Sequence, residues 1–115
     1  MPPSQATVRE IGPVTVVDLS GLLRLGESSA VLRNAVSDLI QKERRKIILN
    51  FRDVTEIDSA GVGELVAAYT AIKKHEGRLT LLNPPKRICD MLELTRLSKV
   101  LEVFNKEDAA LRSFD

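Results

Sequence analysis

The run from Lys46 to Phe51 limits the folds open to this chain more than any other segment. It reads Lys-Ile-Ile-Leu-Asn-Phe, which is short and mostly apolar. Such runs are typical of parallel strands that are covered on both faces. Because a crossover between parallel strands takes about a dozen residues or more, usually as a helix, we expect an α/β domain in which helices and strands alternate.

The rest of the chain supplies the elements that such a sheet needs. Strands are predicted over 7–11, 14–19, 78–82 and 100–104, with a further short strand or extended loop at 22–25. Helices are predicted from a cap at Ser28 or Ser29 to about 43, from about 61 to 75, from Pro85 through Leu92, and over 107–114. Gly12-Pro13 predicts a hairpin turn, and Gly77 a helix end.

This order predicts a single α/β domain with a mixed sheet of four to five strands. About four helices are expected, packed mainly on one face of the sheet. Residues 1–5 are predicted to be a flexible N-terminus and residues 6–115 the folded domain. The length of 115 residues is close to the usual size of one domain.

The composition argues against several classes of function. The net charge is +1 and aromatic residues are only 3% of the chain, which disfavours binding to nucleic acid or to an anionic membrane. No apolar run approaches the ~18–20 residues of a membrane span, and the first five residues lack the pattern of a secretory signal. A single cysteine, Cys89, fits a reducing compartment. We therefore expect a cytoplasmic protein.

The residues that enzymes use are present but poorly arranged. His75 follows Ser59 by 16 residues on the same predicted helix, roughly 24 Å at 1.5 Å per residue, too far for a nucleophile and its base. Cys89 has no histidine near it in the sequence, and no cluster of histidine and cysteine suits zinc. Asp58 with Glu56 or Asp53 is more typical of caps and solvated charges than of a catalytic pair. We expect no catalytic residue, metal or cofactor.

The glycine pair Gly61-Val-Gly63 invites comparison with phosphate-binding loops. The dinucleotide fingerprint fails, because Val66 stands where its third glycine or alanine belongs and Asn83 where an acidic ribose ligand belongs. These glycines are more simply explained by the geometry of the turn into the helix. Their functional interpretation is that bulkier side chains here would block the close approach of a partner's backbone.

Asp58 and Ser59 lie where the buried strand gives way to the long helix. A helix start presents unpaired N–H groups and a partial positive charge. A serine there can cap the helix, and it can also carry a phosphate that the helix tolerates. In this sequence position, Ser59 is a candidate for both roles.

The stretch Ile48-Leu-Asn-Phe-Arg-Asp-Val-Thr-Glu-Ile-Asp-Ser-Ala-Gly-Val-Gly63 resembles the signature of STAS domains, the anti-sigma factor antagonist family of bacteria. Leu19-Ser-Gly21, Gly77 to Asn83 and Met91 to Leu97 agree with further parts of the family pattern. The resemblance runs from about residue 6 to residue 114.

The resemblance implies partner switching. The unphosphorylated protein would bind an anti-sigma factor that is also a serine protein kinase, phosphorylation of Ser59 would release it, and a serine phosphatase would reset it. The implied partner-binding residues follow one another in the motif, with one more upstream: Asp58, Ser59, Ala60, Gly61, Val62, Gly63 and Arg24. We expect a monomer or weak dimer.

Two positions depart from the family pattern. Many antagonists carry an acid where this chain has Arg24, and Arg96 replaces a glycine near a turn. The charge reversal at Arg24 favours a kinase with a different contact surface. It also leaves two alternatives open: a constitutive interaction scaffold that is never phosphorylated, and a sensor of a small ligand.

Overall fold

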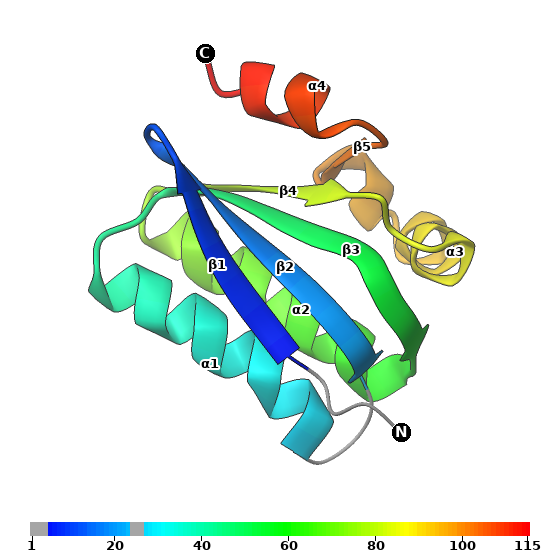
Figure 1. Cartoon of the computed structure of the whole chain (residues 1–115). Coiled ribbons are helices and arrows are strands. Elements are labelled where there is room, and N and C mark those ends of the chain that lie inside the picture. The colour runs from blue at the N-terminus through cyan, green and yellow to red at the C-terminus, as the bar shows by residue number, and fades with distance from the viewer. Residues whose placement is uncertain (1–4, 24–26) are drawn as a thin grey trace.

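The computed structural model describes residues 5–23 and 27–115, which form one mixed five-stranded sheet with helices on both faces (Figure 1). The strands are β1 (Gln5–Ile11), β2 (Val14–Leu23), β3 (Lys46–Ile57), β4 (Arg78–Leu82) and β5 (Glu102–Phe104). The helices are α1 (Glu27–Gln41), α2 (Ser59–Lys74), α3 (Lys86–Leu94) and α4 (Glu107–Arg112), with a 3₁₀ turn at Leu97–Lys99.

The strands lie in sequence order across the sheet. β1 is antiparallel to β2 through the hairpin at Gly12-Pro13, and the other three neighbouring pairs are parallel. Each parallel pair from β2 onward is joined by a helical crossover, as the apolar run at 46–51 predicts. The predicted α/β class and mixed sheet are confirmed, with five strands.

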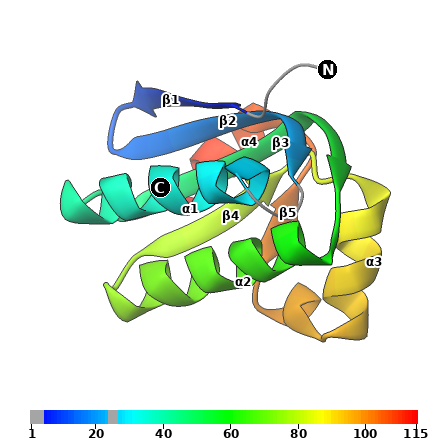
Figure 2. The same cartoon turned by 90° about the horizontal axis from the view of Figure 1, so that it is seen from below.

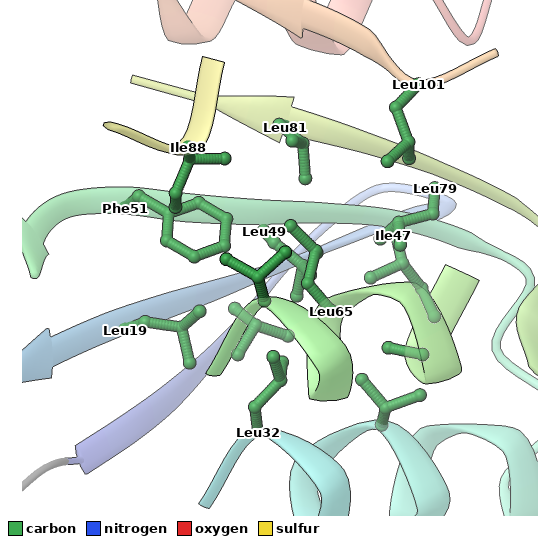
Figure 3. Packing of buried hydrophobic residues seen from close by; sticks show 14 of the residues in the cluster. Leu19, Leu32, Ile47, Leu49, Phe51, Leu65, Leu79, Leu81, Ile88 and Leu101 are labelled. Carbon is green, nitrogen blue, oxygen red and sulfur yellow. The ribbon is translucent and has the colours of Figure 1, made fainter. Parts of the chain in front are cut away.

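The helices lie mainly on one side of the sheet, again as predicted. α1 and α2 lie side by side beneath it, and α4 covers the opposite face (Figures 1 and 2). The larger core lies between the sheet and α1, α2 and α3, where Leu49, Phe51 and Leu65 are almost inaccessible to solvent (Figure 3). A smaller core under α4 gathers Val16, Ile48, Leu82, Ala110 and Phe114.

A charged network joins α4 to the sheet beside this smaller core. Arg9 donates hydrogen bonds to Asp18 at 2.5 and 3.0 Å and to Glu107 of α4 at 2.5 Å. Asn50 of β3 donates to the same Asp18 carboxylate at 2.8 Å. Partial burial acts to raise the pKa of Asp18, but the hydrogen bonds from Arg9 and Asn50 and the charge of Arg9 hold it below its ordinary value. The same contacts raise the pKa of Arg9.

Several predicted boundaries are wrong. β3 continues six residues beyond Phe51, because β2 pairs with it as far as Leu23 and Ile57. α1 begins at Glu27, so Ser28 and Ser29 lie in its first turn and not at its cap. A 3₁₀ turn delays the last strand to Glu102, and α4 ends at Arg112. No helix in the described ranges is long and apolar enough to cross a membrane.

Candidate functional site

The predicted site lies at the junction of β3 and α2. β3 pairs with β4 only as far as Asn50, and its last seven residues extend past β4 with β2 alongside. Ile57 buries its side chain and anchors the end of the strand in the larger core. Asp58 is then the single residue between strand and helix. The junction is therefore tight, and its position is fixed by two buried elements.

Asp58 is the N-cap of α2. Its backbone is extended, with φ −112° and ψ −174°, and its carboxylate accepts a hydrogen bond from the Gly61 N–H at 3.0 Å. The Asp58 carbonyl accepts the first helical bond, from the Val62 N–H, at 3.0 Å. Of the two cap candidates in the sequence, Asp58 is therefore the cap, because the N-cap lies outside the helix and Ser59 is the first residue inside it.

Ser59 is the first residue of α2, and the structure describes its backbone only. A group attached there lies at the positive end of the helix dipole. Ala60 is half-buried, Gly61 and Val62 are buried, and Gly63 is exposed. The predicted residues 58–63 therefore form one helix start, whereas Arg24 falls outside the described residues.

Gly63 has open space where a side chain would stand. Apart from its own stretch of helix, a Cβ built on it meets no atom of the described residues within 4 Å. Glycine inside a helix costs roughly 0.5–1 kcal/mol relative to alanine. Packing among the described residues does not require a glycine at this position. We call the accessible part of the junction, Asp58, Ala60 and Gly63, the α2 entry surface.

The structure separates the residues considered for catalysis. His75 is exposed just beyond the opposite end of α2, and Cys89 is half-buried on α3. Asp53 and Glu56 are exposed on the last part of β3, while Asp58 is engaged as a cap. Across residues 5–23 and 27–115, no group of three or more His, Cys, Asp and Glu side chains is placed to hold a metal ion. Gly61 and Gly63 lie inside α2 and so do not form a glycine-rich loop ahead of it.

A second surface feature was not predicted from the sequence. A cavity of about 320 Å³ lies between α1 and α2. Its lining includes three small residues of α2, Ala67, Ala68 and Ala71. Alanines three and four positions apart are a signal in the sequence, but only the packing of the two helices shows that the space over them stays open.

The fold and the helix entry define a class: a small α/β module in which β3 leads through one capping residue, Asp58, directly into α2. The model of the STAS domain family matches residues 5–110, and the chain belongs to that family. The chain is 27% identical over 105 residues to the anti-sigma F factor antagonist of Paenibacillus polymyxa, covering 89% of this chain and 87% of that protein.

Two further proteins extend the comparison. The anti-sigma-B factor antagonist of Bacillus subtilis is 26% identical over 85 residues, covering 74% of this chain and 77% of that protein. The structure of the Bacillus cell fate determinant SpoIIAA in its phosphorylated form superimposes with a TM-score of 0.79 at 22% identity, covering 96% of this chain and 99% of that one. At this identity the structural likeness shows the shared fold.

Proposed function

We propose that this protein is an anti-sigma factor antagonist that acts by partner switching. In this scheme it binds an anti-sigma factor that is also a serine protein kinase, through the α2 entry surface and the residues around it. Phosphorylation of Ser59 by that kinase ends the complex, and a serine phosphatase restores it. In this scheme the protein itself catalyses no reaction.

The observation that carries this proposal is the helix start at Asp58 and Ser59 together with the bare surface at Gly63. Asp58 already satisfies the Gly61 N–H, so the hydroxyl of Ser59 is not needed as the cap. A phosphate on Ser59 adds about −1.5 to −2 charge, which the helix N-terminus stabilises by roughly 0.3–1 kcal/mol. The fold should therefore tolerate the modification.

A phosphate on Ser59 should weaken the binding of a partner at this surface. Glycine at position 63 leaves room for a partner's backbone to come close. A surface that fits this closely excludes water, and an unpaired phosphate placed there loses its hydration without gaining a partner. The switch is thus a local change in bulk and charge, with little change in the fold.

The test uses the serine kinases of the same cell. Each is incubated with this protein and ATP, and the phosphate is mapped by mass spectrometry after digestion. We expect it on Ser59. Phosphate on Ser28, Ser29 or Thr55 with Ser59 unmodified would refute the site assignment. Amide chemical shifts of the phosphorylated form should change only near residues 54–64, and melting of α2 would contradict the proposed tolerance.

Substitutions at Ser59 separate charge from folding. Ser59→Asp adds a negative charge and should weaken partner binding by about tenfold or more, while Ser59→Ala should bind like the wild type. Because Asp58 supplies the cap, both variants should melt close to the wild-type temperature. Titration against the purified kinase gives the affinity and a thermal melt gives the stability. Equal binding by both variants would place Ser59 outside the interface.

A second candidate function is a constitutive interaction scaffold. Arg24, which stands where many antagonists carry an acid, favours it. The two candidates differ in one measurement: a scaffold binds its partner equally well before and after incubation with ATP.

A further inference from the structure

We propose that the free edge of β1 binds a second copy of this chain. β1 has β2 on one side, and among residues 5–23 and 27–115 no strand lies on its other side (Figure 1). Two β1 strands would pair antiparallel across a twofold axis perpendicular to the sheet, which joins two five-stranded sheets into one. Because this axis reverses the strand direction, the two α2 entry surfaces would lie at opposite ends of the dimer. The pairing therefore does not depend on phosphorylation of Ser59.

β1 lacks the features that usually keep an edge strand from pairing. Protected edges are typically very short, bulged, interrupted by proline or rich in unpaired charge. β1 runs for seven residues without a proline, and its register with β2 is unbroken over all seven pairs. The other edge strand of the sheet, β5, has only three residues. Of the two edges, β1 is the one that offers a long, regular backbone to another strand.

The two charged residues of β1 are already neutralised within the chain. Arg9 donates hydrogen bonds to Asp18 and Glu107. Glu10 forms an ion pair with Arg44 at 2.6 Å. The net charge of the whole chain is only +1, so two copies repel each other little. A strand that pairs here therefore needs no compensating charge, and a second β1 meets that condition.

The hairpin sets which backbone groups of β1 point outward. In an antiparallel ladder the N–H and C=O groups of successive residues point alternately toward and away from the neighbouring strand. The two-residue turn closes on the pair Ile11 and Val14, whose backbone groups face each other. Counting back from Ile11 by this alternation, the groups of Glu10, Val8 and Ala6 face away from β2. The free edge thus offers three evenly spaced pairs of donor and acceptor.

One register pairs this edge with itself over its full length. It places Val8 opposite Val8 of the second copy, on the axis, and no like charges face each other. The registers shifted by two residues pair only 7–11 or 5–9, and the first of them opposes Arg9 to Arg9 of the second copy. In the full register the other pairs are Gln5 with Ile11, Ala6 with Glu10, and Thr7 with Arg9.

The same register covers apolar side chains that β1 leaves exposed. Val8 is 44% exposed and Ile11 is 37% exposed. Val8 would contact Val8 of the second copy, and Ile11 would contact the aliphatic part of Gln5. Few side chains are buried in this way, so the dimer should be weak, with a Kd of about 0.1–1 mM.

The test begins with the concentration dependence of the wild-type protein. Sedimentation equilibrium from about 20 µM to about 1 mM should show a monomer that converts to a dimer. Over the same range, amide chemical shifts should move at residues 5–11, and hydrogen exchange at Ala6, Val8 and Glu10 should slow. A monomer at every concentration, or a dimer whose shifts avoid β1, would overturn the proposal.

Two lysine variants compare the two edges of the sheet. Val8→Lys brings two lysines together on the axis and should weaken dimerisation about tenfold or more. Val103→Lys is the matched control, because Val103 is 40% exposed on β5, and it should leave the dimer unchanged. Thermal melts establish that both variants fold. A folded Val8→Lys protein that dimerises like the wild type would overturn the proposal, as would loss of the dimer in Val103→Lys alone.

A cysteine pair tests the register and does not rely on the lysine variant. In a Cys89→Ser background, Val8→Cys places two thiols on the axis with Cα atoms about 4.5–5.5 Å apart, within reach of a disulfide. Thr7→Cys is the control, since its counterpart lies diagonally at about 7–8 Å. Mild oxidation should crosslink the first variant and not the second, as nonreducing electrophoresis would show. Equal crosslinking of the two variants would overturn the proposed pairing.

Discussion

The two ends of α2 use glycine for opposite reasons. At the N-terminal end, a Cβ added to Gly63 meets nothing within 4 Å. Beyond the C-terminal end, a Cβ added to Gly77 would lie 2.7 Å from the Cγ2 of Ile72 and 2.9 Å from the carbonyl oxygen of Arg45. Packing of the described residues leaves no room for a side chain at position 77, and it does leave room for one at position 63.

This difference separates a glycine that the packing requires from one that it does not. Gly77 is held on both sides: its N–H donates to the Ile72 carbonyl at 2.8 Å, and the next residue donates to the Arg45 carbonyl at 2.7 Å. Gly63 is exposed on the helix, where alanine is the more stable choice. Packing among the described residues does not account for the glycine there, and the proposed partner contact would.

The largest expected effect on stability is at Gly77, just beyond the C-terminal end of α2. Gly77→Ala should destabilise the fold by about 1–3 kcal/mol, because the new methyl group meets a fixed carbonyl as well as a side chain. Denaturant unfolding measures the loss, and Gly63→Ala, the same substitution near the start of α2, is the matched control. An unfolding free energy equal to that of the wild type would mean that the Arg45 carbonyl moves freely, and the contrast would fail.

The cap of α2 should give an intermediate effect. Asp58→Ala removes the acceptor for the Gly61 N–H and should cost about 0.5–2 kcal/mol. Asp58→Asn keeps an oxygen acceptor and should cost less, which tests the hydrogen bond apart from the charge. The same unfolding experiment applies. Equal losses for the two variants would show that the charge, and not the cap, stabilises the helix start.

Gly63→Ala should have a smaller effect on stability, with the opposite sign. Replacing glycine in an exposed helical position should stabilise the fold by roughly 0.5–1 kcal/mol. Binding to the cognate kinase should weaken at the same time, because the methyl group lies on the surface that the partner approaches. The reverse substitution one turn later, Ala67→Gly, should destabilise α2 without affecting the partner. A variant that is both more stable and fully competent in binding would remove Gly63 from the interface.

Low pH should produce the smallest difference in stability between the variants at the two ends of α2. The pKa of Asp18 lies below its ordinary 3.8, so its contribution to stability is complete above that pH and is lost as the pH falls through the lower, folded value. The raised pKa of Arg9 keeps it charged throughout this range. Asp18 lies on the α4 side of the sheet, away from α2. Lowering the pH should therefore reduce the unfolding free energy of Gly63→Ala and of Gly77→Ala by the same amount. Unequal acid titrations of unfolding free energy would show that the two faces are coupled.

Much of the fold is visible in the sequence because its signals are local. The apolar run at 46–51 and the hairpin turn at Gly12-Pro13 predict the parallel strand and the antiparallel edge that the structure shows. Gly77 was predicted as the residue that ends α2, and the helix does end at Lys74. The left-handed residue at that end is Glu76, with φ 63°, and Gly77 serves close packing instead. Packing of this kind depends on Arg45, which is distant in the sequence.

The junction of β3 and α2 also combines a feature visible in the sequence with one that depends on distant contacts. Asp58 and Ser59 can be picked out as a helix start from sequence alone, but the choice between them as the cap depends on where the helix begins. β2 extends β3 to Ile57, which leaves only Asp58 between strand and helix. Because strand pairing continues to Ile57, Asp58 is the N-cap of α2 and Ser59 lies in the first turn of the helix.

By itself, the sequence determined the class of fold, the order of its elements and the motif from Asp58 to Gly63, because hydrophobic periodicity and turn residues act over a few neighbouring positions. Only the tertiary structure decided that Gly77 is closely packed while Gly63 has open space, and that a groove remains between α1 and α2 over Ala67, Ala68 and Ala71. These features depend on contacts between segments far apart in the chain, whose spacing is set by the packing of whole helices and strands.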